Sequence, residues 1–126
     1  MEIKSRFDHY NINVLDLQKS LDFYEKALGL KEVRRKESSD GSFILVYIGD
    51  NTTGFTLELT WLRDWDRPYK LGDNEQHLCV RVENDYDQTR SFHKEMGCVC
   101  YENEKMGLYF INDPDGYWIE ILPLKR

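Results

Sequence analysis

The stretch NDPDGYWIEIL, residues 112–122, decides the fold, because a second stretch of the chain has the same design. A Pro-Asp-Gly turn leads into alternating apolar residues, which predict a strand, and Glu120 lies in the middle of it. The stretch GFTLELTWL, residues 54–62, places Glu58 in the same way. Glutamate is a poor strand former and is rarely buried without a partner. Packing alone therefore does not explain two such carboxylates.

Outward from these two strands, the chain divides into two copies of one pattern. Residues 8–61 predict a strand, a helix and three further strands, and residues 76–123 predict the same order. Four matched pairs are each 68 positions apart, namely His9 with His77, Val14 with Val82, Tyr24 with Phe92 and Gly29 with Gly97. Glu58 and Glu120 are 62 positions apart, so the second copy is shorter. The sequence therefore predicts an internal duplication of a βαβββ unit.

Helix signals and a polar linker complete this prediction. Asp16 is the predicted cap of the first helix and Asn84 that of the second, with Gly29 and Gly97 as their stops. Leu62–Glu75 is a charged segment that we expect to be solvated. The predicted fold class is α+β, with two tandem βαβββ modules forming a cupped mixed sheet within one domain, residues 1–126.

Composition excludes several classes of function. The 126 residues carry 17 Lys and Arg against 23 Asp and Glu, with no basic run, so nucleic acid is not an expected partner. No apolar stretch reaches the roughly 18 residues of a membrane span, and the first residues lack the apolar core of a signal peptide. A cytoplasmic protein with no membrane partner is predicted. Cys79, Cys98 and Cys100 match neither a redox pair nor a common zinc spacing, so we expect reduced thiols packed as small apolar side chains.

Strand parity places four side chains on matching faces. In each copy a His in the first strand and a Glu in the last strand lie away from the apolar face that the helix must cover. If the two sheets combine into one cupped surface, His9, Glu58, His77 and Glu120 converge. Two imidazoles and two carboxylates suit a divalent first-row metal. The alternative, hydrogen-bonded strand histidines and glutamates on a wet face, stays open for each residue alone, but repetition in both copies favours the metal site.

These same segments carry a family resemblance. HYNINVLDLQKSLDFYEKALGL, LELTW, QHLCVRV and FINDPDGYWIEIL resemble the glyoxalase I (lactoylglutathione lyase) branch of the vicinal oxygen chelate superfamily, in order and over nearly the whole chain. The resemblance implies metal ligands at His9, Glu58, His77 and Glu120, with nickel or cobalt favoured and zinc possible. It implies a small-molecule substrate, the hemithioacetal of methylglyoxal and a thiol, which becomes a lactoyl thioester. Glu120 is then the favoured base and Glu58 its counterpart.

The resemblance also implies a homodimer in which each metal takes one His/Glu pair from each chain. Two positions depart from the family pattern, since Asn13 stands where an Arg is usual and Leu62 where an Asn is usual. Both family residues help to hold glutathione, so the thiol is either glutathione or another low-molecular-weight thiol. Lys105, Arg63 and Arg67 are candidate replacements, although loop cations are ordinarily solvated. Further candidates for lining a substrate pocket, each also explicable as packing, are Met106, Trp61, Trp65 and Trp118.

Other functions compete with this one. Another metal-dependent member of the superfamily, such as an acyl-CoA epimerase or a thiol transferase, needs the same chelated oxyanion. An iron dioxygenase requires two His and one carboxylate with open positions, which four candidate ligands disfavour. A drug-binding resistance protein of the same fold typically lacks the metal ligands. His93, the remaining histidine, is expected to be exposed and uninvolved.

Overall fold

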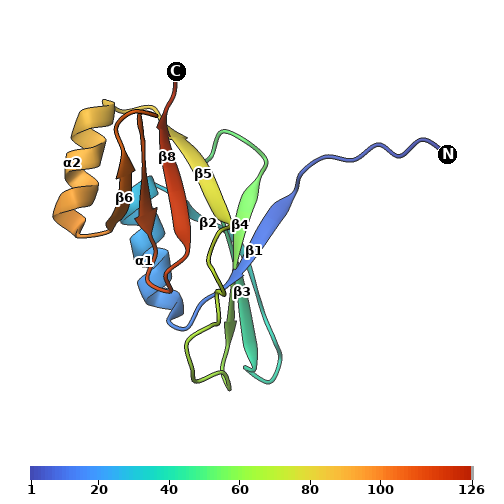
Figure 1. Cartoon of the computed structure of the whole chain (residues 1–126). Coiled ribbons are helices and arrows are strands. Elements are labelled where there is room, and N and C mark those ends of the chain that lie inside the picture. Colours follow the sequence, from blue (N-terminus) through green and yellow to red (C-terminus); the bar gives the residue numbers. More distant parts are fainter. Residues whose placement is uncertain (126) are drawn as a thin grey trace. The chain divides into compact units, whose positions relative to one another are not determined.

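The computed structural model describes residues 1–125 and divides into two compact units (Figure 1). The first unit is residues 1–69 and the second begins at Lys70. Each unit holds one copy of the predicted repeat, a four-stranded mixed sheet with one helix. The α+β fold with two tandem βαβββ modules is therefore confirmed.

The elements follow the predicted order in both modules. The first module consists of β1 (His9–Asn13), α1 (Leu17–Leu28), β2 (Lys31–Glu37), β3 (Phe43–Gly49) and β4 (Thr56–Leu62). The second module consists of β5 (His77–Val82), α2 (Tyr86–Met96), β6 (Val99–Asn103), β7 (Leu108–Asn112) and β8 (Trp118–Pro123).

Both sheets have the same topology. The strand order is β1-β4-β3-β2 in the first module and β5-β8-β7-β6 in the second. In each sheet the first and last strands of the module pair in parallel, and the other pairings are antiparallel. This pairing places Asn11 opposite Glu58 and Cys79 opposite Glu120. His9 lies two residues before Asn11, and His77 lies two residues before Cys79. In each sheet the His and the Glu are therefore diagonal neighbours on one face.

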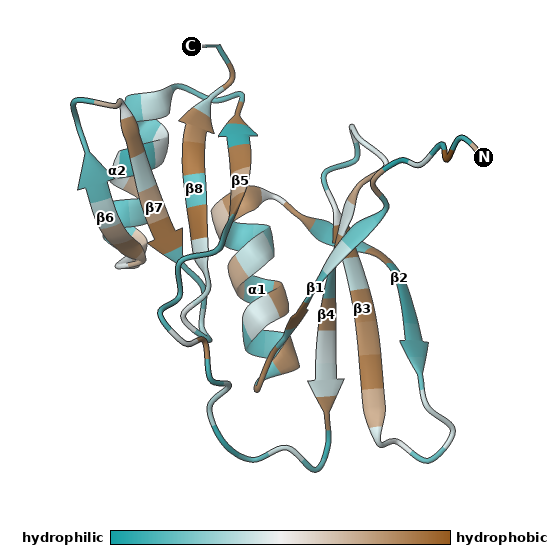
Figure 2. Ribbon diagram, turned by 45° about the vertical axis from the view of Figure 1, so that its right-hand side comes forward, coloured by the Kyte–Doolittle hydropathy of each residue, from teal (hydrophilic) through white to brown (hydrophobic). Residues whose placement is uncertain are grey.

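Alternation along the strands builds the two cores. In β4, Leu57 and Leu59 are buried on either side of Glu58, and in β8 Ile119 and Ile121 flank Glu120 in the same way. The edge strand β2 is exposed throughout and charged at every position except Val33, in contrast to the apolar β3 beside it (Figure 2). Charged side chains on an exposed edge strand oppose unwanted strand pairing.

The helix ends confirm three of the four predicted signals. Asp16 caps α1 by accepting a hydrogen bond from the Lys19 amide at 3.0 Å. Gly29 and Gly97 end the two helices in the left-handed conformation that glycine adopts without strain. The prediction of Asn84 as the second cap is wrong. Asp85 holds that position, because its side chain reaches the Gln88 amide at 2.9 Å.

This cap shifts the second helix by one residue relative to the constant spacing predicted from the repeat. The caps Asp16 and Asp85 are 69 positions apart rather than 68, so the counterpart of Tyr24 is His93 and not Phe92. Tyr24 and His93 are both fully buried, whereas Phe92 is exposed. The expectation of an exposed His93 is therefore wrong. Its Nδ1 lies 2.8 Å from the buried Tyr109 hydroxyl.

The predicted linker is only partly solvated. The Trp65 and Tyr69 rings stack with centroids 4.9 Å apart, and the Arg67 guanidinium lies 3.7 Å from the centre of the Trp65 ring. Asn74 donates a hydrogen bond to the Gly116 carbonyl at 3.0 Å. Among the described residues, no helix has the length and apolar character needed to cross a membrane.

The three cysteines are free thiols, as predicted, but only partly buried. Cys98 is buried, and burial raises the pKa of its thiol. Cys79 is exposed on β5, contrary to the expectation that it packs as a small apolar side chain. It is exposed because parity places it on the face that α2 does not cover, together with His77.

Candidate metal and proton-transfer site

In the first module, sheet pairing brings His9 and Glu58 together. The Nε2 atom of His9 lies 3.6 Å from Oε1 of Glu58. The Glu58 side chain is 11% exposed and that of His9 is 37% exposed. A buried carboxylate thus faces a half-exposed imidazole across β1 and β4, as strand parity predicts.

Two further side chains hold this pair. The Tyr47 hydroxyl donates a hydrogen bond of 2.6 Å to Oε2 of Glu58, which raises the pKa of Tyr47. Asp8 lies 2.6 Å from Nδ1 of His9, and this hydrogen bond lowers the pKa of the Asp8 carboxyl. A neutral His that donates a hydrogen bond from Nδ1 to a carboxylate has no proton on Nε2, so Nε2 can accept a hydrogen bond or bind a metal. In His9 this nitrogen lies on the side of Glu58.

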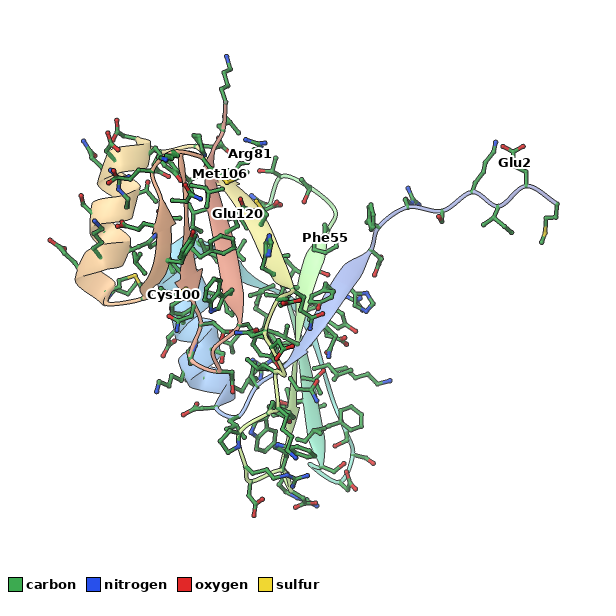
Figure 3. The ribbon with its side chains drawn as sticks, in the orientation of Figure 1. Glu2, Phe55, Arg81, Cys100, Met106 and Glu120 are labelled. Carbon is green, nitrogen blue, oxygen red and sulfur yellow. The ribbon has the colours of Figure 1, made fainter. Side chains whose placement is uncertain are left out.

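In the second module, His77 and Glu120 meet in the same way. Nε2 of His77 lies 3.2 Å from Oε1 of Glu120. Figure 3 labels Glu120 on β8, and its side chain is 17% exposed. The position before His77 is Gln76, and the strand partner of Glu120 on β7 is Phe110. The second pair therefore has neither the adjacent carboxylate nor the phenolic hydroxyl of the first.

The two pairs have different surroundings. Beside the first pair, the Arg34 guanidinium lies 3.7 Å from the centre of the Tyr47 ring, and Thr60 hydrogen-bonds to Asn11. Beside the second pair, three aromatic rings from neighbouring strands pack together, those of Tyr101, Phe110 and Trp118. The first face is polar and has a cation on its tyrosine, whereas the second has an aromatic cluster, with Cys79 and Arg81 on the same face of β5 as His77.

The donor atoms fit a divalent first-row metal. Two ligands about 2.1 Å from one ion and about 90–109° apart are themselves separated by about 3.0–3.4 Å. The two His–Glu distances, 3.6 Å and 3.2 Å, are close to this range. Within residues 1–125 there is no group of three or more His, Cys, Asp or Glu side chains arranged to hold a metal. Each module thus offers two candidate donors, one His and one Glu.

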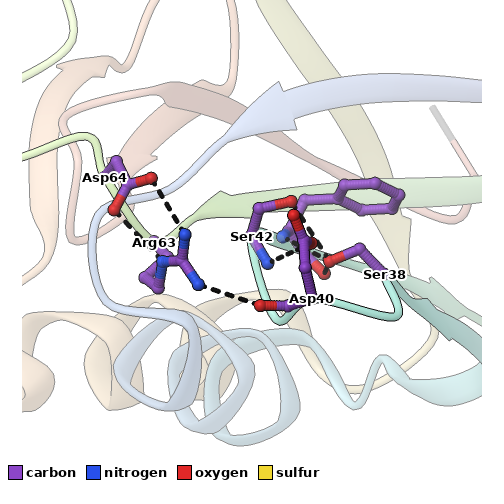
Figure 4. Close-up of polar contacts among 6 residues, drawn as sticks. Ser38, Asp40, Ser42, Arg63 and Asp64 are labelled. Carbon is purple, nitrogen blue, oxygen red and sulfur yellow. Dashed lines mark hydrogen bonds and ion pairs between the residues drawn. The ribbon is translucent and has the colours of Figure 1, made fainter.

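Of the predicted replacement cations, the structure assigns other contacts to two. Arg63 donates to the Asp40 carbonyl at 2.9 Å and pairs with Asp64 at 3.1 Å (Figure 4). Arg67 stacks on Trp65. Both guanidinium groups therefore stabilise local loop structure. Arg34, which strand parity identifies on the Glu58 face through its pairing with Tyr47, was not among the predicted cations.

Comparison with known proteins identifies the family. The model of the glyoxalase/bleomycin resistance protein/dioxygenase superfamily matches residues 6–121. The chain belongs to this superfamily. A lactoylglutathione lyase of Neisseria meningitidis serogroup A is 38% identical over 95% of this chain and 91% of its own length. A lactoylglutathione lyase of Escherichia coli O157:H7 is 32% identical over 95% of this chain and 93% of its own length.

Among solved structures of the superfamily, the trypanothione-dependent glyoxalase I of Leishmania major is similar with a TM-score of 0.84. It is 31% identical, and the match covers 97% of this chain and 88% of that chain. Together with the curated relatives, it places this chain among the lactoylglutathione lyase-type enzymes of the superfamily.

Sequence reasoning missed three residues of the site, Asp8, Arg34 and Tyr47. Tyr47 lies between Val46 and Ile48 in β3, and its pairing with Glu58 in the sheet puts the two side chains on one face. The signal that locates Asp8 is its position directly before His9. The signals at Tyr47 and Arg34 become informative only once the register of the neighbouring strands is known.

Proposed function

We propose that this enzyme isomerises the hemithioacetal of methylglyoxal and a thiol to a lactoyl thioester. The observation that carries the proposal is the same His/Glu pair at the same place in both modules, with donor atoms at ligand-like distances. The names of the curated relatives, lactoylglutathione lyase, agree with this reaction.

In this proposal His9, Glu58, His77 and Glu120 together hold one divalent metal, with nickel or cobalt favoured and zinc possible. The bound metal supplies electrostatic stabilisation for the charge that develops on two adjacent substrate oxygens. Both carboxylate side chains are mostly buried, and two close carboxylates repel each other unless a cation lies between them. The ligand set therefore suits a cation.

Glu120 acts as the general base. Its carboxylate takes the proton from the carbon that bears sulfur and oxygen and returns it to the neighbouring carbon, while the hydroxyl proton of the first carbon passes to the oxygen of the second. The product is an isomer of the substrate, so the proton is conserved and neither an oxidant nor a reductant is required. Glu58 is its counterpart carboxylate, contributed by the first module.

The thiol is glutathione or another low-molecular-weight thiol. Position 13 is Asn and position 62 is Leu, where the family resemblance implies an Arg and an Asn that help to hold glutathione. The missing Arg matters most, because a guanidinium that binds a carboxylate through two hydrogen bonds is a strong contact. The similar Leishmania major enzyme is trypanothione-dependent, so members of this branch differ in their thiol.

We also propose a two-fold homodimer with two shared sites. Each module by itself offers one donor pair, and each site uses His9 and Glu58 of one chain with His77 and Glu120 of the other. A symmetric dimer forms two such sites at once. Each chain contributes its first module to one site and its second module to the other.

The test combines metal binding with a thiol-by-thiol assay. Protein stripped with a chelator is reloaded with nickel, cobalt or zinc, and thioester absorbance is followed with methylglyoxal and glutathione, trypanothione or a simple thiol. We expect turnover that depends on the metal and on one preferred thiol. Absence of turnover with every metal and thiol, or full turnover of the stripped protein, would contradict the proposal. The control is Tyr10→Phe, a substitution on the opposite face of β1 from His9. It should respond to chelation and metal reloading as the wild type does.

A further inference from the structure

The two carboxylates of the site differ in how firmly they are held. Glu58 has both oxygens engaged, since Oε2 accepts a hydrogen bond from Tyr47 while Oε1 faces His9. Glu120 faces His77 through Oε1, and its strand partner on β7, Phe110, has no hydroxyl. The same ligand type therefore occurs in an anchored form and in a less restrained form.

We propose that Tyr47 is a positioning residue that fixes Glu58 as a stationary metal ligand, assisted by Asp8 on His9, and thereby leaves Glu120 as the carboxylate that moves. This inference rests on the proposed function, because it concerns the same four residues. Tyr47 thereby has a positioning role, and the two carboxylates have different roles, one stationary and one mobile.

Burial makes the Tyr47 contact persistent. Tyr47 is 8% exposed and Glu58 is 9% exposed, so water has little access to their 2.6 Å hydrogen bond. If Glu58 turned away, it would leave a buried hydroxyl without its acceptor, which is costly. Glu58 is therefore held in one orientation, with Oε1 on the side of the imidazole.

Asp8 acts on the imidazole in the same sense. Its carboxylate accepts from Nδ1 of His9 at 2.6 Å, which fixes the ring orientation and the tautomer that presents Nε2. Tyr47 also packs edge-on against the His9 ring, with centroids 5.4 Å apart and an angle of 87° between the ring planes. The His9–Glu58 pair is thus supported at both residues.

The second module provides an internal comparison. Phe110 takes the place of Tyr47, since it pairs with Glu120 in the sheet and packs edge-on against His77 at 5.0 Å and 88°. The ring contacts are alike in the two modules. What the second module lacks is the hydroxyl at Phe110 and the carboxylate at Gln76. A base that is also a ligand must leave the ion to accept a proton, and Glu120 is free of the phenolic hydrogen bond that holds Glu58.

The first experiment measures metal affinity rather than activity. Tyr47→Phe removes only the hydroxyl, and we expect the dissociation constant for nickel to rise about 10- to 100-fold, as is typical when a group that orients a ligand is lost. Tyr10→Phe removes a hydroxyl from the opposite face of β1 and should leave the constant within about twofold of wild type. The melting temperature of the metal-free proteins separates loss of positioning from general destabilisation.

The reciprocal substitution installs the anchor in the second module. Phe110→Tyr places a hydroxyl beside Glu120, and we expect kcat to fall about tenfold with nickel binding unchanged or tighter, because a charge-assisted hydrogen bond must break before the base can act. This variant decides the question even if Tyr47→Phe does not fold. If the wild type binds metal, either of two results overturns the inference. One is unchanged nickel affinity in Tyr47→Phe, and the other is unchanged kcat in Phe110→Tyr. A wild-type protein that binds no divalent metal overturns the proposed function itself.

Discussion

The first and second modules present the same His/Glu pair on the same sheet topology, yet the side chains around the two pairs have diverged. Around His9 and Glu58 the neighbours are polar and charged, with Tyr47 hydrogen-bonded to Glu58 and Asp8 to His9. Around His77 and Glu120 the neighbours are aromatic rings and the exposed thiol of Cys79. Duplication supplies two equivalent His–Glu positions, and differences at the neighbouring positions make the surroundings of the two carboxylates unequal.

The largest effect expected from this comparison is a difference between the two glutamates. Glu120→Gln should lower kcat by about 10²- to 10⁴-fold, the usual contribution of a positioned base. Glu58→Gln keeps the proposed base and should retain a larger fraction of activity. Turnover and bound nickel are measured together for both variants. Wild-type turnover in Glu120→Gln with normal metal content would refute the assignment of the base.

Complementation tests whether one pair from each module is shared between chains. A His9→Ala, Glu58→Ala chain and a His77→Ala, Glu120→Ala chain should each be inactive. After subunit exchange we expect about a quarter of wild-type activity, because about half of the dimers are mixed and each has one intact site of two. Exchange demonstrated by a mass label with no return of activity would contradict the shared sites.

Stability should follow the corrected correspondence between the helices. His93→Ala removes a fully buried side chain and leaves the Tyr109 hydroxyl without its partner, so the free energy of unfolding should fall by about 2–4 kcal/mol. The neighbouring Phe92 is exposed, and Phe92→Ala should cost less than about 1 kcal/mol. Urea unfolding followed by fluorescence measures both. Equal losses in the two variants would contradict the one-residue shift.

The smallest effect concerns the thiol beside the second pair. Cys79 is exposed and lies opposite Glu120 in the sheet, whereas Cys98 is buried and burial raises the pKa of its thiol. Because the thiolate is the reactive form, an alkylating reagent at about pH 8 should label Cys79 first and Cys98 last. Mass spectrometry of digested samples gives the order. Bound nickel should slow only the labelling of Cys79, and Cys79→Ser should abolish the fastest labelling event.

The sequence predicted the two His–Glu pairs, which the structure brings together, but not the residues beside them. His9, Glu58, His77 and Glu120 stand out because each is a polar residue repeated within an apolar alternation. Tyr47 does not stand out, since a tyrosine in a strand is ordinary, and its role depends on the strand register that places its hydroxyl on Glu58. The Asn84 and Phe92 predictions failed for another reason. A constant spacing between the copies cannot reveal a one-residue insertion that is compensated before the helix ends.

That compensated shift has a practical meaning for engineering by module exchange. Helix α1 has 12 residues and α2 has 11, and each lies between an aspartate cap and a left-handed glycine. A helix transplanted between the modules at positions of constant numbering would arrive rotated by about 100° about its axis, with an exposed side chain turned toward the sheet. Grafts cut at Asp16 and Asp85, and at Gly29 and Gly97, preserve the buried faces. The caps are therefore the natural crossover points for recombining the two halves of this chain.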